Sequence, residues 1–147
     1  MIIVITGTPG TGKTTLAKSI AKKKKSVYID VNKLIKEYKL SEGYDRKRKC
    51  SIINIAKLKK VLVSIIKKAN KSKKSLIIDS HLSHYIQPKY VDLCIVTKCS
   101  LKELKKRLQK KGYNSQKTRE NLEAEAFDIC LIEAREAGHK IKTVDTT

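Results

Sequence analysis

The sequence has 147 residues, of which 40% are apolar, so it is long enough for one domain with a hydrophobic core. Its apolar runs all fall short of the ~20 residues that a membrane-spanning helix needs, which argues against a membrane protein. The formal net charge of +20 at pH 7 favours contact with polyanions such as RNA, and a general lysine bias on a solvated surface is an equal alternative.

A short apolar run opens the chain and leads into a glycine-rich loop. Residues 2–5 are apolar and β-branched, which is typical of a strand buried on both faces. Residues 7–14 read GTPGTGKT and match the phosphate-loop pattern G-x-x-x-x-G-K-[ST] at every fixed position. Apolar residues at helical spacing follow to about residue 24. Strand, loop and helix are therefore in the order that this motif requires.

The loop residues predict a site for a nucleoside triphosphate with magnesium. Glycines allow a tight turn whose N–H groups point at phosphate oxygens, and the helix that follows adds the positive end of its dipole. Lys13 can reach the β- and γ-phosphates, the Thr14 hydroxyl can ligate Mg²⁺, and Thr15 can hydrogen-bond a phosphate further back. The dinucleotide-binding motif G-x-G-x-x-G is absent from the sequence.

Residues 27–30 form the predicted second strand, and the helix before it implies a right-handed crossover and a parallel pair. The segment from Asp30 to Ile53 then begins with a helical pattern at residues 31–38 and turns polar from Ser41 to Cys50. Long excursions in compact domains are often functional. This segment is either the pocket for a phosphate acceptor or plain surface structure.

The clearest helix after the first covers residues 58–66. Its apolar side chains recur at i, i+3, i+4, i+7 and i+8, and lysines occupy the other side from residue 57 to residue 68. We expect the apolar stripe to pack on the sheet rather than to bind a membrane, and the outer face to be basic.

An apolar strand at residues 76–79 delivers a carboxylate at its end. Asp79 in this position resembles a Walker B element and can hold Mg²⁺ directly or through a water. His81 lies two residues later, where it can orient a water or an acceptor near the γ-phosphate. A hydrogen-bonded structural histidine is the alternative for His81, and we interpret His84 and Tyr85 as structural or loop residues.

The last third of the chain begins with a predicted strand at residues 91–97. A helix follows that begins with a capping box at Ser100 and stops at Gly112. A second helix is predicted at residues 121–137 and a fifth strand at residues 141–145. The basic loop at residues 110–120 contains Lys111. Such a loop can close over a triphosphate as a lid that excludes water and supplies positive charge, or it can be an ordinary basic loop.

The cysteines and the start of the chain bear on location. The four cysteines have neither a C-x-x-C pair nor metal-ligand spacing, which favours a reducing, cytoplasmic location. The first strand begins at residue 2, so we expect no signal peptide.

Several segments together resemble one family, the adenylate-kinase-like NTPases of archaea and eukaryotic nuclei, which include the coilin-interacting nuclear ATPase. The match is carried by GTPGTGKTT at 7–15, EGYD at 42–45, DSHLSHY at 79–85, RLQKKGY at 107–113, ENLEAE at 120–125 and VDTT at 144–147. These segments extend over nearly the full length. The middle ones are the specific ones, because many families share a phosphate loop.

The resemblance implies a single P-loop domain over residues 1–147, an α/β fold with a five-stranded parallel sheet of order 2-3-1-4-5, an acceptor segment at about residues 30–53 and a lid at about 110–120. It implies Mg²⁺ and ATP as cofactors, with triphosphate-binding residues at Gly10, Gly12, Lys13, Thr14 and Thr15 and a Walker B pair at Asp79 and His81. It also implies a broad-specificity nucleoside monophosphate kinase, ATP + AMP giving two ADP, that hydrolyses ATP as well. The implied partners are a small-subunit ribosomal protein and rRNA, in maturation of that subunit. The alternative is an ATP-hydrolysing assembly switch with negligible kinase activity, and an RNA-binding protein whose phosphate loop is only structural is a third possibility.

The sequence departs from the family pattern in two places. Lys111 occupies the lid position where the family usually has arginine, and lysine lacks the bidentate fork for phosphate, so Arg107 or Arg119 is a candidate substitute. The family usually has a closing helix after the last strand, whereas this sequence ends at Thr147. We expect the sheet face under that helix to be exposed or covered by a partner.

Overall fold

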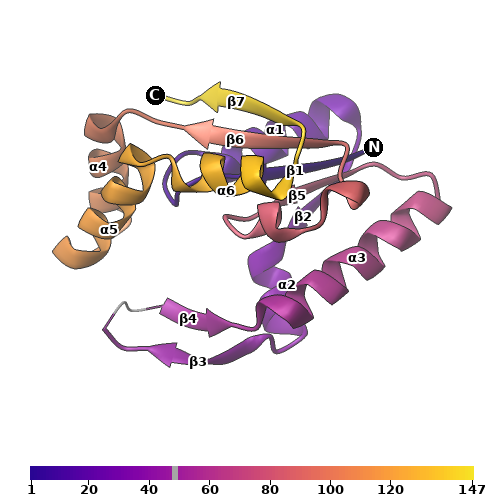
Figure 1. Ribbon diagram of the computed structural model, residues 1–147, viewed down its shortest axis with the longest axis horizontal. Coiled ribbons are helices and arrows are strands. Elements are labelled where there is room, and N and C mark those ends of the chain that lie inside the picture. Colours follow the sequence, from indigo (N-terminus) through magenta and orange to yellow (C-terminus); the bar gives the residue numbers. More distant parts are fainter. Residues whose placement is uncertain (48–49) are drawn as a thin grey trace.

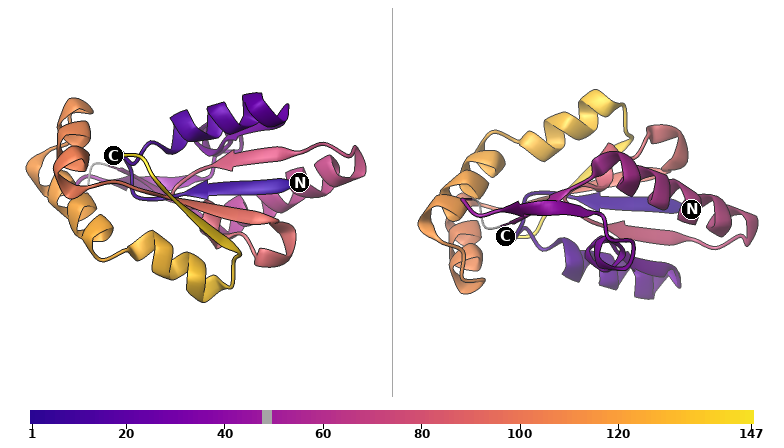
Figure 2. Two further views of the ribbon diagram at one scale, coloured as in Figure 1. Left: turned by 90° about the horizontal axis from the view of Figure 1, so that it is seen from above. Right: turned by 90° about the horizontal axis from the view of Figure 1, so that it is seen from below.

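The computed structural model describes residues 1–47 and 50–147, and its core is a parallel sheet between two layers of helices (Figures 1 and 2). The sheet strands are β1 (Ile2–Thr6), β2 (Val27–Asp30), β5 (Leu76–Asp79), β6 (Leu93–Lys98) and β7 (Ile141–Asp145), in the order β2-β5-β1-β6-β7. Numbered among themselves along the chain, these strands have the order 2-3-1-4-5, which confirms the predicted fold. Among the described residues, no helix combines the length and the apolar character that crossing a membrane requires.

The alternating faces of the strands pack on different helices. Ile3, Ile5 and Ile77 point to one face, where they pack on α1 (Lys13–Lys24). Val4 and Ile78 point to the other face, where they pack on α3 (Ile55–Lys71), α2 (Val31–Glu37) and α6 (Ile129–Ala137). All five side chains are nearly inaccessible to solvent. Burial on both faces explains why the strands read as apolar runs rather than as alternating patterns.

On the α1 face, the edge of the sheet at β7 is only partly covered. Lys142 is exposed, and Leu93 and Val144 are half-buried.

The predicted acceptor segment contains an element that the sequence did not reveal. The short helix is confirmed as α2, but the polar residues after it form an antiparallel hairpin, β3 (Ser41–Asp45) and β4 (Cys50–Ile53), rather than irregular structure. The hairpin projects from the body below α2 and the start of α3 (Figure 1). Nearly all of its residues are exposed. The strands therefore lack the alternation of apolar and polar residues by which a sequence predicts a half-buried strand. Arg48, which falls in this polar segment, lies outside the described residues.

The lid segment and the helix after it also differ from prediction. Helix α4 (Leu101–Lys110) ends where expected, but α5 (Ser115–Ala126) begins inside the predicted loop at 110–120, so the loop prediction is wrong from residue 115 onward. Asn114 starts α5 because its side chain accepts a hydrogen bond from the Lys117 amide at 2.8 Å. The predicted single helix at 121–137 is broken before α6, since Asp128 adopts a left-handed conformation with φ 53°.

Two short 3₁₀ turns complete the fold. They are η1 (Ser83–Tyr85) and η2 (Pro88–Tyr90), between β5 and β6. Within η1, His84 is buried between the Thr6 hydroxyl, 2.6 Å from Nδ1, and the Glu133 carboxylate, 2.7 Å from Nε2. These contacts tie α6 to the end of β1 and agree with the structural role expected for His84.

Candidate nucleotide-binding site

The phosphate loop lies between the end of β1 and the start of α1, at the carboxyl edge of the parallel sheet. Its tight path depends on glycine at two positions. Gly7 has φ 148°, and a Cβ atom there would collide with the Thr97 side chain on β6. Gly12 has φ 83° and immediately precedes α1, so its conformation aims the first helical turn and its unpaired N–H groups into the loop. The predicted strand, loop and helix are therefore all present.

The Lys13 ammonium is held inside the loop. Its Nζ atom donates to the carbonyl oxygens of Gly7 at 3.0 Å and Thr8 at 3.2 Å. Burial, with a smaller contribution from the charge of Lys111, lowers the pKa of Lys13 to about 8 against the opposing attraction of Asp79. A poorly solvated cation of this kind gains from an anionic ligand that replaces its lost water.

Thr14 and Asp79 meet across the sheet edge. The Thr14 hydroxyl donates to Asp79 Oδ2 at 2.7 Å, and the Tyr28 hydroxyl from β2 donates to the same oxygen at 2.8 Å. Hydroxyl and carboxylate oxygens are the ligands that Mg²⁺ prefers, and Mg²⁺ in nucleotide sites takes its remaining ligands from phosphates and water. The described residues include no cluster of three acidic, His or Cys side chains that could hold a metal alone. The pair therefore fits a magnesium ion that arrives with a phosphate ligand.

One pocket of about 720 Å³ collects nearly all the predicted triphosphate-binding residues. Its lining includes Gly10, Gly12, Lys13, Thr14, Thr15 and Lys111. Arg107 also lines it and holds the last strand over the loop, since its guanidinium donates to the Gly10 carbonyl at 3.4 Å and to the Thr146 hydroxyl at 3.2 Å. Of the two arginines considered as substitutes for the lid arginine, Arg107 thus lies in the pocket. Arg119 lines a different one and is largely exposed.

His81 faces a second pocket, on the other side of the loop. This pocket has a volume of about 360 Å³, and its lining includes Thr8, Pro9, Cys50, Tyr113 and Lys117. His81 is exposed at the surface, but desolvation by the surrounding protein and the charges of Lys13 and His84 lower its pKa to about 4. The ring is therefore neutral at pH 7. The structure places His81 near the loop but outside the larger pocket. Asp79 does not line that pocket either, and contacts it through the Thr14 hydroxyl.

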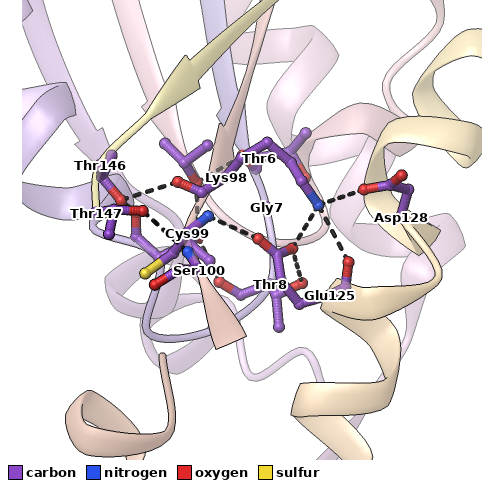
Figure 3. A network of polar contacts seen from close by, with 12 residues as sticks. Thr6, Gly7, Thr8, Lys98, Cys99, Ser100, Glu125, Asp128, Thr146 and Thr147 are labelled. Carbon is purple, nitrogen blue, oxygen red and sulfur yellow. Dashed lines mark hydrogen bonds and ion pairs between the residues drawn. The ribbon is translucent and has the colours of Figure 1, made fainter. Parts of the chain in front are cut away.

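A buried carboxylate on α5 accepts a hydrogen bond from the phosphate loop (Figure 3). Glu125, near the end of α5, is only 5% exposed. It accepts hydrogen bonds from the Thr8 hydroxyl at 3.0 Å, from Lys98 Nζ at 2.8 Å and from the Cys99 amide at 2.8 Å. Lys98 also pairs with Asp128 at 2.5 Å, and these contacts hold the pKa of Lys98 above its ordinary value despite partial burial. One network therefore joins the phosphate loop, the end of β6 and both helices after the lid.

Comparison of the sequence with known proteins shows the family to which this chain belongs. The family described as an AAA domain matches residues 3–128. The chain is 41% identical to a protein of Methanosarcina acetivorans named "putative adenylate kinase", over 100% of this chain and 78% of that one. It is 34% identical to the "adenylate kinase isoenzyme 6 homolog" of Caenorhabditis elegans, over 92% of this chain and 72% of that one. The chain belongs to the adenylate kinase family that these relatives represent.

The adenylate kinase assignment agrees with the structural neighbours. The crystal structure of a Chloroflexus aurantiacus protein titled "putative kinase" aligns with TM-score 0.59 at 18% identity over 99% of this chain and 88% of that one. The deoxyadenosine kinase of M. mycoides, solved with dATP, aligns with TM-score 0.53 at 17% identity over 99% and 90% of the two chains. At these identities the likeness shows the fold alone, which is that of P-loop kinases.

The sequence prediction for this adenylate kinase relative missed two site residues. In the sequence Tyr28 belongs only to the predicted strand at 27–30. The pairing of β2 with β5 puts Asp30 beside Asp79 and Tyr28 on the strand next to that carboxylate. In the sequence Glu125 is one of several acidic residues of the predicted helix at 121–137. Its signal was its place in the apolar pattern of α5, three residues after the half-buried Leu122.

Proposed function

We propose that this chain is a magnesium-dependent nucleoside monophosphate kinase that transfers the γ-phosphoryl group of ATP to AMP. The observation that carries the proposal is the pair of pockets on the two sides of the phosphate loop. The larger one has Lys13, Lys111 and Thr14 for a triphosphate, and Asp79 reaches its edge through the hydrogen bond from Thr14. The smaller one, beside Thr8 and Pro9, is open to an acceptor. The family relationship supports a nucleotide kinase over other phosphate-loop functions.

In this proposal the protein does little covalent chemistry. The acceptor phosphate oxygen forms a bond to the γ-phosphorus as the bond to the β-phosphate oxygen breaks, and ADP leaves on each side. Lys13 and Lys111 offset the negative charge on the transferred group, and the loop amides hold it in line. Thr14 and Asp79 would hold a magnesium ion, which would supply positive charge to the phosphate groups when bound. The acceptor would lie between Cys50 of the hairpin and Lys117 of the segment at 110–120, since both line the smaller pocket. Lys111 of the same segment would lie over the triphosphate in the larger pocket.

The test is to measure ADP and free phosphate from Mg²⁺ and ATP, with and without AMP. We expect AMP to raise ADP production by at least an order of magnitude with no matching release of phosphate. Phosphate release that is indifferent to AMP would reject the kinase and leave an ATPase. UMP, CMP and GMP in place of AMP measure how broad the acceptor range is.

A second activity, ATP hydrolysis, is favoured by the neutral ring of His81 beside the loop. A ring nitrogen that carries no proton can accept a hydrogen bond from water and orient it toward the γ-phosphate. We predict that His81→Ala lowers phosphate release about 10-fold or more while AMP-dependent ADP production changes less than about 3-fold. Because the pKa of His81 is about 4, its contribution to hydrolysis should be constant from pH 6 to pH 8. Equal loss of both activities would reject the assignment.

The Tyr28 hydroxyl provides a more selective probe of the metal site. Removing it in Tyr28→Phe leaves Asp79 Oδ2 with one donor instead of two, so the carboxylate is held less firmly. We predict that the free Mg²⁺ concentration for half-maximal rate changes about 3- to 10-fold, with kcat at saturating Mg²⁺ within about 2-fold of the parent. Tyr38→Phe, at an exposed tyrosine, is the matched control. A changed kcat without a changed Mg²⁺ requirement would contradict the role.

We also propose a setting in maturation of the small ribosomal subunit, with a ribosomal protein or rRNA as partner. The family resemblance and the net charge of +20 support this proposal. Hydrolysis without acceptor phosphorylation would fit an assembly switch, whereas AMP-dependent transfer would fit an enzyme of nucleotide balance. Co-sedimentation of the parent and of Lys13→Met with 30S precursors, with and without ATP, distinguishes an ATP-dependent association from its absence.

A further inference from the structure

Helix α3 and its flanks form the most one-sidedly charged part of the molecule. No aspartate or glutamate occurs between Asp45 and Asp79, a stretch rich in lysine and arginine. The apolar stripe of α3 packs into the core, where Leu58, Leu62 and Ile66 are almost inaccessible to solvent. The lysines are therefore forced to the outer side of the helix.

These lysines surround a groove rather than a flat surface. The groove has a volume of about 630 Å³ and runs along the outer side of α3 toward η2. Its cationic lining consists of Lys59, Lys60, Lys67, Lys68 and Lys71, and no carboxylate lines it. Within residues 1–47 and 50–147, none of these lysines forms an ion pair with an acidic side chain. The cations of the groove are thus available to an external anion.

Tyr90 fixes part of this charge at the far edge of the groove. The ring packs against the main hydrophobic core, and the Nζ atoms of Lys67 and Lys89 lie 6.0 and 5.0 Å from its centroid. Cation–π contact at this distance holds an ammonium without neutralising it. Together with Val63, the ring also gives the groove an apolar surface between its cations.

We propose that this groove binds the sugar–phosphate backbone of single-stranded RNA without regard to sequence. Lysines supply contacts to successive phosphates, and the apolar surface at Tyr90 and Val63 suits unpaired bases, which a duplex keeps inside its stack. The inference deepens the proposed RNA setting and rests on it for its biological context. It does not depend on phosphoryl transfer, because the lysine-rich end of α3 leads into the start of β5, whereas the phosphate loop lies at the opposite, carboxyl edge of the sheet (Figure 1).

The experiment compares two triple variants of equal charge change. Lys60, Lys67 and Lys71 are exposed and lie along one line of α3, and Lys22, Lys23 and Lys24 are exposed at the end of α1. Each set is changed to glutamine. Binding of a fluorescein-labelled 15-nucleotide oligouridylate is measured by anisotropy between 50 and 200 mM KCl, with Mg²⁺ and ADP present to occupy the phosphate loop. The kinase activity of both variants is measured in parallel.

In the α3 variant, the loss of three phosphate contacts should make the plot of log association constant against log salt concentration less steep by about 2. This corresponds to about 100-fold weaker binding at 100 mM salt. The α1 variant should bind within about 3-fold of the parent, and both should keep full phosphotransfer. Equal loss in both variants, equally tight binding of a 15-base-pair duplex, or equally tight α3-dependent binding of polyglutamate would overturn the proposal. The last outcome would indicate an acidic protein partner. Lack of kinase activity in all three proteins with intact RNA binding would reject the proposed enzyme and leave this inference standing.

Discussion

Lys13→Met should reduce AMP-dependent ADP production about 1000-fold while leaving the nucleotide-free protein at least as stable at pH 7.5. The loss is large because no other described side chain of the larger pocket has its ammonium inside the phosphate loop. The stability is preserved because the folded protein holds this ammonium in a poorly solvated place, as the lowered pKa of about 8 indicates. Lys22→Met, at an exposed position on the same helix, should change neither property.

The stability of Lys13→Met relative to the parent should also depend on pH. Between the folded pKa of about 8 and the ordinary value of 10.5, the unfolded chain binds a proton that the folded protein has released. The free energy of unfolding of the parent should therefore rise relative to Lys13→Met as the pH increases from 8 through that window, and the two should run parallel below pH 8. Urea titrations at pH 7.5, 8.5 and 9.5 measure this difference. A difference that falls with rising pH would refute the burial of the ammonium.

Glu125→Ala should be the most destabilising single change in the site region, by about 3 kcal/mol. It leaves the Thr8 hydroxyl and the Cys99 amide without their acceptor and removes one of two carboxylates from Lys98 (Figure 3). For a chain of this length, the melting temperature should fall by roughly 10 °C. Because the phosphate loop loses its anchor at Thr8, KM for ATP should rise about 10-fold as well.

Thermal melts of Glu125→Ala and Glu123→Ala, with and without Mg²⁺ and ATP, check this prediction. Glu123 lies on the same helix with its side chain 62% exposed, so its replacement should cost less than about 0.5 kcal/mol. Nucleotide should restore part of the melting temperature of Glu125→Ala, since ligand binds only the folded protein. Equal melting of the two variants would show that the network does not hold the loop.

The sheet was predictable because its residues are constrained on both sides. Strands such as residues 2–5 and 76–79 are apolar throughout, and the phosphate-loop pattern fixes the turn that joins the first strand to its helix. The hairpin at 41–53 was not predictable, because a pair of exposed strands has neither an apolar face nor a period-2 pattern. The break at Asp128 was hidden for another reason. No Gly or Pro marks it in the sequence, and the ion pair of Asp128 is with Lys98, 30 positions earlier in the chain.

The part of the site that belongs to the phosphate-loop motif and its neighbouring strand was predictable from the sequence. Lys13, Thr14 and Asp79 follow from the phosphate loop and the parallel sheet, which brings strand ends to a common edge. Tyr28 and Glu125 become visible only when the pairing of β2 with β5 and the packing of α5 on the loop are known. Local sequence thus specifies the groups that meet phosphate, and tertiary contacts specify the groups that hold them.

The central position of β1 has a consequence for synthesis of the chain. β1 pairs with β5 from Leu76 and with β6 from Leu93, so after its own synthesis it waits for some seventy further residues before it can pair. At typical elongation rates this wait lasts about 4 to 14 s. During that interval Ile2, Ile3, Val4 and Ile5, all but inaccessible in the finished protein, are without their partners. The nascent chain, rather than the folded enzyme, is therefore the form of this protein most in need of a chaperone.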